Sequence, residues 1–183
     1  MDYSFADYLR VDCDSAVRHE FVDGVILAVA GGTPEHAALA AAVIMSLASQ
    51  LEGRPCRVFS EALRVRAPAT KFAGYADVTV VCSKLELDPD DRHTVLNPSV
   101  LVEVLSPSTA LYDRTQKLRH YQSIPSVHHI VFIPHDAKAI EVVTREADGW
   151  RVETAGPGER AALTHIACEL DVDAVFRDPL AGA

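Results

Sequence analysis

Two apolar runs constrain this chain more than any other feature, because each of them carries a single acidic residue. The first run is Tyr75–Cys82 with Asp77, and the second is Pro98–Leu105 with Glu103. Both runs predict buried strands, where an ionised carboxylate is costly unless a cation or a hydrogen-bond donor meets it. Asp77 lies five positions before the end of the first run, and Glu103 lies five positions after the start of the second run. Antiparallel pairing through the polar segment 83–97 would place the two acids side by side, and a hard cation between them would offset their repulsion.

Length and composition indicate one globular domain, residues 1–183. Hydrophobic residues make up 49% of the chain, and no apolar run approaches the roughly 20 residues of a membrane helix. The N-terminal residues lack the pattern of a signal peptide. The four cysteines are scattered without a C-x-x-C pair, which predicts a reduced cytoplasmic protein with neither a disulfide framework nor a zinc site. A net charge of −9 argues against a general nucleic-acid coat protein, but it allows an enzyme with a local basic rim.

The first third of the chain contributes two candidate site residues, Glu20 and His36. Glu20 begins the first arm of a hairpin predicted over His19–Ala30, because Asp-Gly is a turn signal between alternating arms. His36 lies in the first turn of a helix predicted over 34–52, with Thr33 as its N-cap. Taken alone, Glu20 is more commonly an exposed strand-end acid and His36 a surface histidine.

Two arginines share one face of the next predicted strand. Arg64 and Arg66 are two residues apart, and side chains at that spacing point the same way from a strand. This pattern is typical of a solvated strand face, and it would equally suit phosphate contacts beside a carboxylate site. Residues 68–74 are predicted to form a loop that leads to the Asp77 strand.

A helix predicted over 110–123 follows the Glu103 strand and presents Asp113, Lys117 and Tyr121 on one face. A surface pair between Lys117 and Asp113 is the simpler interpretation of that spacing. Because the helix starts close to Glu103 in the sequence, Lys117 could instead lean over the two acids. The C-terminal part from Gly156 onward is predicted to be peripheral.

Two carboxylates with a backbone carbonyl would bind Mg²⁺ or Mn²⁺ incompletely and leave positions for water and a phosphate oxygen. Such a metal acidifies water and neutralises charge on phosphorus, and a nearby lysine can position the water. This is the chemistry of metal-dependent phosphodiester hydrolysis, although the residues by themselves do not name that reaction.

Five ordered segments together resemble the Uma-type family of putative restriction endonucleases, within the PD-(D/E)XK nuclease superfamily. They are His19–Gly24, Thr33–His36, Tyr75–Cys82, Leu101–Thr109 and Tyr112–Tyr121, and the resemblance extends from about Tyr8 to Phe176. It implies an α/β (mixed α+β) restriction-endonuclease-like core, with a mixed β-sheet flanked by helices and an added N-terminal β-hairpin.

The resemblance also implies roles for individual residues. Asp77 and Glu103 would be the metal ligands, and Lys117 would replace the superfamily lysine, whose usual position holds Leu105 here. Glu20 and His36 match positions that carry glutamate and histidine in the family, which moves both toward a catalytic role. Three positions depart from the pattern: Ala76 replaces a proline, Ala62 replaces an acid, and the segment 128–134 differs from the family's typical strand.

Three functions are therefore open at this stage. The first is a Mg²⁺- or Mn²⁺-dependent DNA endonuclease, as a homodimer if it cuts both strands. Its candidate substrate contacts are Arg64, Arg66, Arg114 and Tyr121. The second is a nuclease-fold protein that binds nucleic acid or a partner without cleaving it, and the third is a metal-dependent hydrolase of a small substrate. An Asp77→Ala variant would separate the first from the second, and a broad basic groove rather than a small closed pocket would separate the first from the third.

Overall fold

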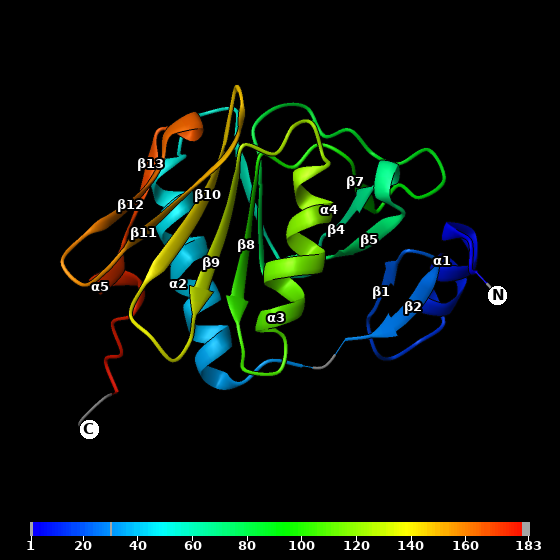
Figure 1. Cartoon of the computed structure of the whole chain (residues 1–183), viewed down its shortest axis with the longest axis horizontal. Coiled ribbons are helices and arrows are strands. Elements are labelled where there is room, and N and C mark those ends of the chain that lie inside the picture. Colours follow the sequence, from blue (N-terminus) through cyan, green and yellow to red (C-terminus); the bar gives the residue numbers. More distant parts are fainter. Residues whose placement is uncertain (1, 30, 181–183) are drawn as a thin grey trace.

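Two mixed β-sheets form the centre of the molecule (Figure 1), which is a computed structural model that describes residues 2–29 and 31–180. The first sheet has six strands in the order β11-β10-β9-β8-β6-β3. Their bounds are Gly149–Ala155, Ile140–Glu146, His129–Pro134, Val100–Leu105, Val78–Val81 and Arg57–Ser60. The second has five strands in the order β2-β1-β5-β4-β7. Their bounds are Val25–Ala28, His19–Val22, Phe72–Tyr75, Arg64–Ala67 and Thr94–Val95. The predicted mixed α+β class is confirmed, and the N-terminal hairpin β1–β2 belongs to the second sheet.

The predicted antiparallel pairing of the two acid-bearing runs is present between β6 and β8. Val78 lies opposite Val102 and Val80 lies opposite Val100. The same register, continued by one residue, places Asp77 opposite Glu103. On its other edge β8 pairs with β9 in parallel, so both neighbours of β8 are strands and its six residues are buried.

The chain passes from one sheet to the other immediately before Asp77. The run 75–82 was predicted as one strand, but β5 ends at Tyr75 in the second sheet and β6 starts at Val78 in the first. The predicted loop over 68–74 is also wrong: Pro68–Thr70 forms a 3₁₀ turn, and Phe72 begins β5. Both differences have one cause, since β5 fills the space between β1 and β4 and local sequence does not encode that pairing.

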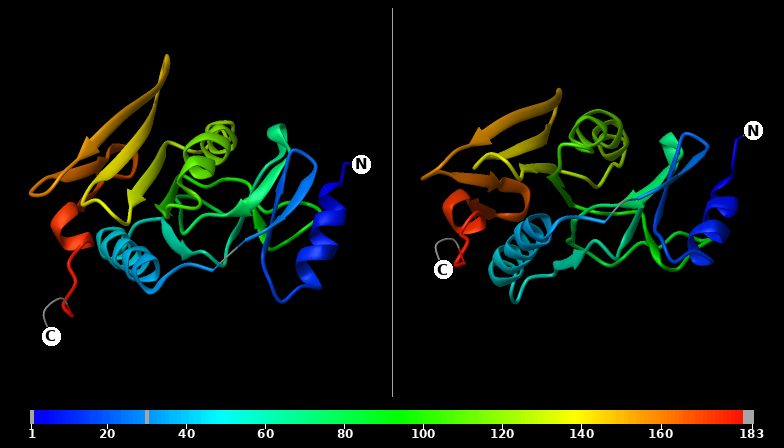
Figure 2. Two further views of the ribbon diagram at one scale, coloured as in Figure 1. Left: turned by 60° about the horizontal axis from the view of Figure 1, so that its bottom comes forward. Right: turned by 90° about the horizontal axis from the view of Figure 1, so that it is seen from below.

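Helices cover both faces of the six-stranded sheet (Figure 2). Helix α2 (Pro34–Gln50) is capped by Thr33, whose side chain accepts from the His36 N–H, and its buried residues pack on the face that includes Val78 and Val102. The opposite face is covered by a helix made of α3 (Ala110–Tyr112), a π-helical turn η2 (Asp113–Lys117) and α4 (Leu118–Gln122). Glu103 alternates with Val102 along β8, so it points toward this second helix. Helix α1 (Phe5–Cys13) packs against β1.

The C-terminal part belongs to the core, which corrects the prediction that it is peripheral. It forms the pair β12 (Arg160–Leu163) and β13 (Cys168–Asp171), a 3₁₀ turn η3 (Thr164–Ile166) and helix α5 (Val172–Val175). Leu163, Leu170 and Val172 are fully buried against the α2 face of the large sheet. Ala30, predicted as the end of the hairpin, and residues 181–183 lie outside the described residues.

A disulfide joins Cys56 to Cys82, so the prediction of wholly reduced cysteines is wrong. Arg57 of β3 lies opposite Val81 of β6, and the two cysteines are the next pair in that register. Their Cα atoms are 3.9 Å apart. The two cysteines are 26 residues apart in the sequence. Their contact depends on the pairing of β3 with β6 at the edge of the six-stranded sheet, and no local sequence pattern indicates that pairing.

The described residues contain no helix that combines the length and the apolar character needed to cross a bilayer.

Candidate active site

Asp77 lies at the crossing between the two sheets and at the edge of a cluster of acids. Its Oδ2 accepts the backbone N–H of Val104 at 2.7 Å, which fixes the carboxylate against the end of β8. Its Oδ1 lies 2.8 Å from Nε2 of His36, and the pKa of His36 is raised by this hydrogen bond. The side chains of Asp77 and His36 are 17% and 22% exposed, so together they form the solvent-facing side of the cluster.

Glu103 forms the buried side of the same cluster. Lys117 donates to both carboxylate oxygens of Glu103, at 3.1 and 3.2 Å, and to the backbone carbonyl of Tyr75 at 3.2 Å. The hydroxyl of Tyr121 donates to Glu103 Oε1 at 2.5 Å. Tyr121 is completely buried, which corrects its expected role as a substrate contact, because it orients Glu103 instead.

Glu20 enters the cluster from β1 and is held on both sides. Its Oε1 forms an ion pair with Lys117 at 3.0 Å, and its Oε2 accepts the hydroxyl of Tyr112 at 2.7 Å. Gly74 of β5 makes this approach possible: a Cβ atom at Gly74 would lie 3.0 Å from Glu20 Oε1 and 2.7 Å from Cζ of Phe72. Glu20 is therefore buried at the site, and it is not an exposed strand-end acid.

The π-helical turn Asp113–Lys117 explains how one short helix supplies several side chains to the cluster. A π turn adds a residue to the helical turn, and such turns occur frequently at functional sites. Here Tyr112, Lys117 and Tyr121 all reach the acids, while Asp113 lies 3.6 Å from Lys117. The predicted Lys117–Asp113 pair thus exists, but Lys117 also contacts Glu103 and Glu20.

Burial dominates the electrostatics of the cluster. Burial raises the pKa of Glu103 well above its ordinary value; Lys117 opposes this effect, and the charge of Asp77 adds to it. Burial likewise raises the pKa of Asp113. For Lys117 burial acts to lower the pKa, but the surrounding acids, Glu103 foremost, outweigh it and raise the pKa well above its ordinary value.

Asp77 and Glu103 are the residues of this cluster that could hold a hard divalent cation, because the β6–β8 register places them opposite each other. Lys117 is paired with three carboxylates, those of Glu20, Glu103 and Asp113, and Asp77 is paired with His36 beside them. Among the described residues no group of three or more histidine, cysteine or acidic side chains is arranged so that it could hold a metal ion. Mg²⁺ does not require one, since it is usually held by one or two carboxylates and keeps several waters. Asp77 and Glu103 would supply those carboxylates.

The three arginines predicted to contact substrate are paired with acids outside the cluster. Arg64 is buried between Asp12 and Asp91, at 2.5 Å from each, and it also donates to the hydroxyl of Tyr75. Arg66 pairs with Asp88 and lies over the ring of Phe5. Arg114 pairs with Glu141 of β10 at 2.6 Å. These pairings give Arg64 and Arg66 structural roles, because their guanidinium groups tie the second sheet to helix α1 and to the 83–97 segment.

Sequence reasoning missed two residues that shape the cluster, Tyr112 and Gly74. Tyr112 stands five positions before Lys117, a spacing that shares a face only across a π turn. Gly74 was predicted to lie in a loop, where glycine is common and does not by itself indicate a close contact. The close approach of Glu20 to Gly74 depends on the β1–β5 pairing, in which Phe21 lies opposite Ala73.

Comparisons with known proteins agree with this fold. A crystal structure described as a putative nuclease belonging to DUF820, from Anabaena variabilis ATCC 29413, superposes with a TM-score of 0.78 at 17% identity. The match covers 93% of this chain and 96% of that one. At this identity the likeness establishes the fold alone. The arrangement of the two sheets and their flanking helices is thus shared with that protein.

Sequence comparison is more specific. The chain belongs to the Uma2 family, described as putative restriction endonuclease, whose model matches residues 5–173. Two uncharacterised proteins of Synechocystis sp. (strain ATCC 27184 / PCC 6803 / Kazusa) are similar to it. One, slr1290, is 29% identical over 175 residues, covering 93% of this chain and 90% of that protein. The other, sll1609, is 27% identical over 158 residues, covering 86% and 89%.

Proposed function

We propose that this protein is an endonuclease that hydrolyses DNA phosphodiester bonds with the help of Mg²⁺ or Mn²⁺. The observation that carries the proposal is the meeting of Asp77 and Glu103 across two paired strands, beneath a buried lysine and beside an accessible histidine. Membership of a family of putative restriction endonucleases supports the same class of reaction. DNA as the substrate and the metal ion are both part of the proposal.

Asp77 and Glu103 would hold the metal ion. When bound, a divalent ion of this kind acidifies a coordinated water and offsets the charge that develops on the phosphoryl oxygens. The cluster itself provides the rest of the chemistry. Val104, Tyr121 and Lys117 hold the two carboxylates in fixed orientations, so that little reorganisation is needed when substrate arrives.

Lys117 acts as a fixed positive charge in this scheme. The surrounding acids outweigh burial and raise its pKa, which favours the ammonium form, so we assign it an electrostatic role and not that of a base. Its charge would stabilise the developing negative charge of a phosphorane-like transition state. Glu20 and Tyr112 keep Lys117 in place from the side of the second sheet.

His36 is the group that we assign to proton transfer. Its Nε2 is bonded to Asp77, its ring is partly exposed, and it lies at the start of α2, where a water or a leaving oxygen could reach it. A histidine is suited to such transfer near neutral pH.

Cleavage of both strands of a duplex requires two active sites. We therefore include in the proposal a homodimer whose two copies are related by a two-fold axis.

Cleavage of supercoiled plasmid tests this function. Purified protein is incubated with plasmid in the presence of Mg²⁺, Mn²⁺ or EDTA, beside Asp77→Asn and Lys117→Met variants. An Asp90→Asn variant is the matched control, since Asp90 is exposed and lies in the 83–97 segment. We expect nicked and linear products with either metal and none with EDTA. The two site variants should be slower by about 10²–10³-fold, and Asp90→Asn unchanged.

Two results would contradict the proposal. Cleavage that persists in EDTA or in Asp77→Asn would come from a contaminant and not from this cluster. Failure of the folded wild-type protein to cut plasmid, linear duplex or single-stranded DNA with either metal would remove the assignment as a DNA endonuclease.

A further inference from the structure

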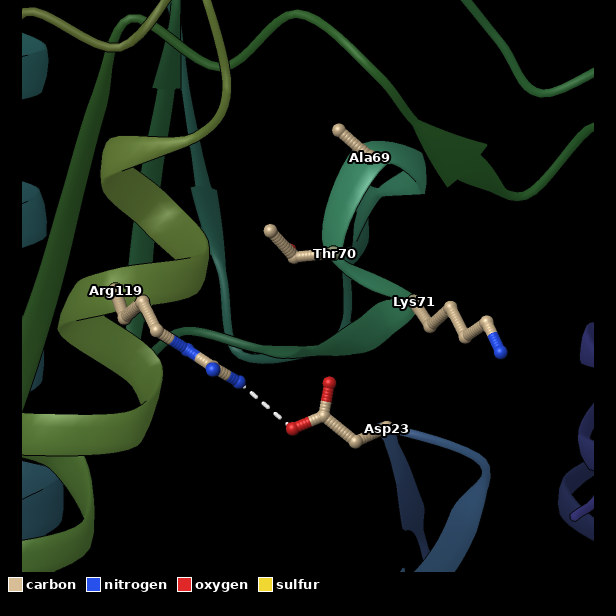
Figure 3. A pocket seen from close by; sticks show the side chains of 5 residues that line it. All are labelled: Asp23, Ala69, Thr70, Lys71 and Arg119. Atoms are coloured by element: carbon tan, nitrogen blue, oxygen red, sulfur yellow. Dashed lines mark hydrogen bonds and ion pairs between the residues drawn. The ribbon is translucent and has the colours of Figure 1, made fainter.

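A second candidate site lies outside the acid cluster, in a cavity of about 340 Å³ between the β1–β2 turn, the start of β5 and α4 (Figure 3). Its lining is Asp23, Ala69, Thr70, Lys71 and Arg119. Arg119 donates to Asp23 at 2.7 Å across the cavity, and the side chain of Lys71 extends past Asp23 on the other side. We propose that this cavity binds a phosphate group of a nucleic-acid backbone. That identification of the anion rests on the proposed function.

The charge of the cavity favours an anion. The lining holds two cationic side chains and one carboxylate, so its net charge is +1 in a chain whose total is −9. The carboxylate of Asp23 faces Arg119, and the ammonium group of Lys71 points away from it (Figure 3). Most arginines of this protein are neutralised by nearby acids, as Arg64 is by Asp12 and Asp91. Lys71 is exposed and takes part in none of the ion pairs among the described residues. It can therefore offer its full charge to a ligand.

The lining is fixed in place by contacts between separate segments. Lys71 and Asp23 both adopt left-handed backbone conformations, with φ of 49° and 50°, and the Asp23 N–H donates to the Lys71 carbonyl at 3.1 Å. Such conformations are unfavourable for residues with a Cβ and persist where tertiary contacts hold them. Thr70 is held by hydrogen bonds of its hydroxyl to His120 at 2.9 Å and Ser123 at 3.2 Å. A preformed site loses little entropy on binding.

The position of the cavity relative to the acid cluster suits one continuous substrate. Strand β1 carries Glu20 into the cluster and ends at the turn that holds Asp23. At the rise of a strand, the backbone positions of these two residues are roughly 10 Å apart. The helix that carries Lys117 into the cluster carries Arg119 into the cavity. A polynucleotide whose scissile phosphate lies at the cluster could thus place a neighbouring phosphate in the cavity, where Arg119 and Lys71 would contact its oxygens.

Binding of DNA in EDTA tests the proposal separately from cleavage. Fluorescence anisotropy of a labelled duplex is measured against salt for wild type, Lys71→Gln and Asp23→Asn. The matched control is Lys138→Gln, because Lys138 is also an exposed lysine. Lys71→Gln should weaken binding roughly fivefold and reduce the slope of log affinity against log salt concentration by about 1, the value for one phosphate contact. Asp23→Asn should tighten binding, because it removes the one negative charge of the lining, and Lys138→Gln should match wild type.

Competition with inorganic phosphate and with a mononucleotide distinguishes the source of the phosphate group. Weak competition at millimolar concentration is expected for a site that takes a backbone phosphate. Displacement of the duplex by micromolar free phosphate would instead identify a site for a free ligand and overturn the proposal. Lys71→Gln with wild-type affinity and salt slope would also overturn it, as would Asp23→Asn binding more weakly than wild type. If Lys71→Gln behaves as wild type while plasmid is still cut in an Asp77-dependent way, this inference fails and the proposed function stands.

Discussion

Replacement of Lys117 by methionine is the sharpest test of how the acid cluster is held together. The ammonium group of Lys117 is buried and lies within 3.2 Å of both oxygens of Glu103 and of one oxygen of Glu20. Methionine has a similar length and no charge, so the substitution removes the cation with little change in packing. Glu103 would then remain buried without a counter-charge.

The size of the effect follows from that burial. Removal of one partner from a buried ion pair costs about 3–5 kcal/mol, because the other charge is left uncompensated. For a chain of this length that loss corresponds to a fall in Tm of about 6–20 °C. The cost should shrink as the pH falls. The pKa of Glu103 is raised in the folded protein by its burial, so the folded state binds the proton more tightly than the unfolded state and gains stability as the pH decreases.

Urea unfolding at pH 8 and at pH 5.5 provides the measurement, followed by fluorescence of Trp150, the single tryptophan. EDTA is included so that no divalent ion replaces the lost charge. Lys117→Met/Glu103→Gln should be clearly more stable than Lys117→Met alone at pH 8, because the uncompensated carboxylate is gone. Lys138→Met, at an exposed lysine, should unfold as wild type does.

Two outcomes would refute this reasoning. A loss of less than about 1 kcal/mol in Lys117→Met at pH 8 would show that Lys117 does not neutralise the acids. A double variant no more stable than the single one would show that the cost comes from packing and not from an unpaired charge.

Three further predictions concern other parts of the fold. Gly74→Ala should destabilise the protein by about 1–3 kcal/mol and weaken any activity, since its Cβ would lie 2.7 Å from Cζ of Phe72 and 3.0 Å from Oε1 of Glu20. Urea unfolding and plasmid cleavage measure the two effects, and wild-type behaviour would contradict the packing described. Burial lowers the pKa of His129 to about 4, so the unfolded chain takes up a proton before the folded chain does, and the free energy of unfolding should fall by up to about 3 kcal/mol between pH 6.5 and 4. Urea unfolding of wild type and His129→Gln over this pH range checks this, and an equal loss of stability in both proteins would assign the loss to other groups. Reduction of the Cys56–Cys82 bond should lower the free energy of unfolding by about 2–4 kcal/mol in urea titrations with and without dithiothreitol, and identical curves would argue against the bond.

The central pair of the candidate site could be predicted from sequence because Asp77 and Glu103 lie in two consecutive apolar runs joined by one polar segment, 83–97. The symmetric placement of Asp77 and Glu103 in two strands gave their juxtaposition, and the β6–β8 register agrees with it. The start of α2 followed from Thr33, whose side chain caps the helix. The shared face of Lys117 and Tyr121 followed from helical spacing, and both side chains reach Glu103.

Features that depend on pairing between distant segments could not be predicted in this way. Arg64 was a candidate phosphate contact, but Asp12 and Asp91 approach it from other parts of the chain and neutralise it. The disulfide depends on the register of β3 with β6, and Gly74 on the β1–β5 pairing, neither of which leaves a local pattern.

Binding of Mn²⁺, followed by electron paramagnetic resonance without substrate, tests most directly whether Asp77 and Glu103 form a metal site. We predict one Mn²⁺ per chain for the wild type, at least tenfold weaker binding in Asp77→Asn and in Glu103→Gln, and unchanged binding in Asp90→Asn. Wild-type affinity in both site variants, or no Mn²⁺ bound to the folded wild-type protein, would contradict the account.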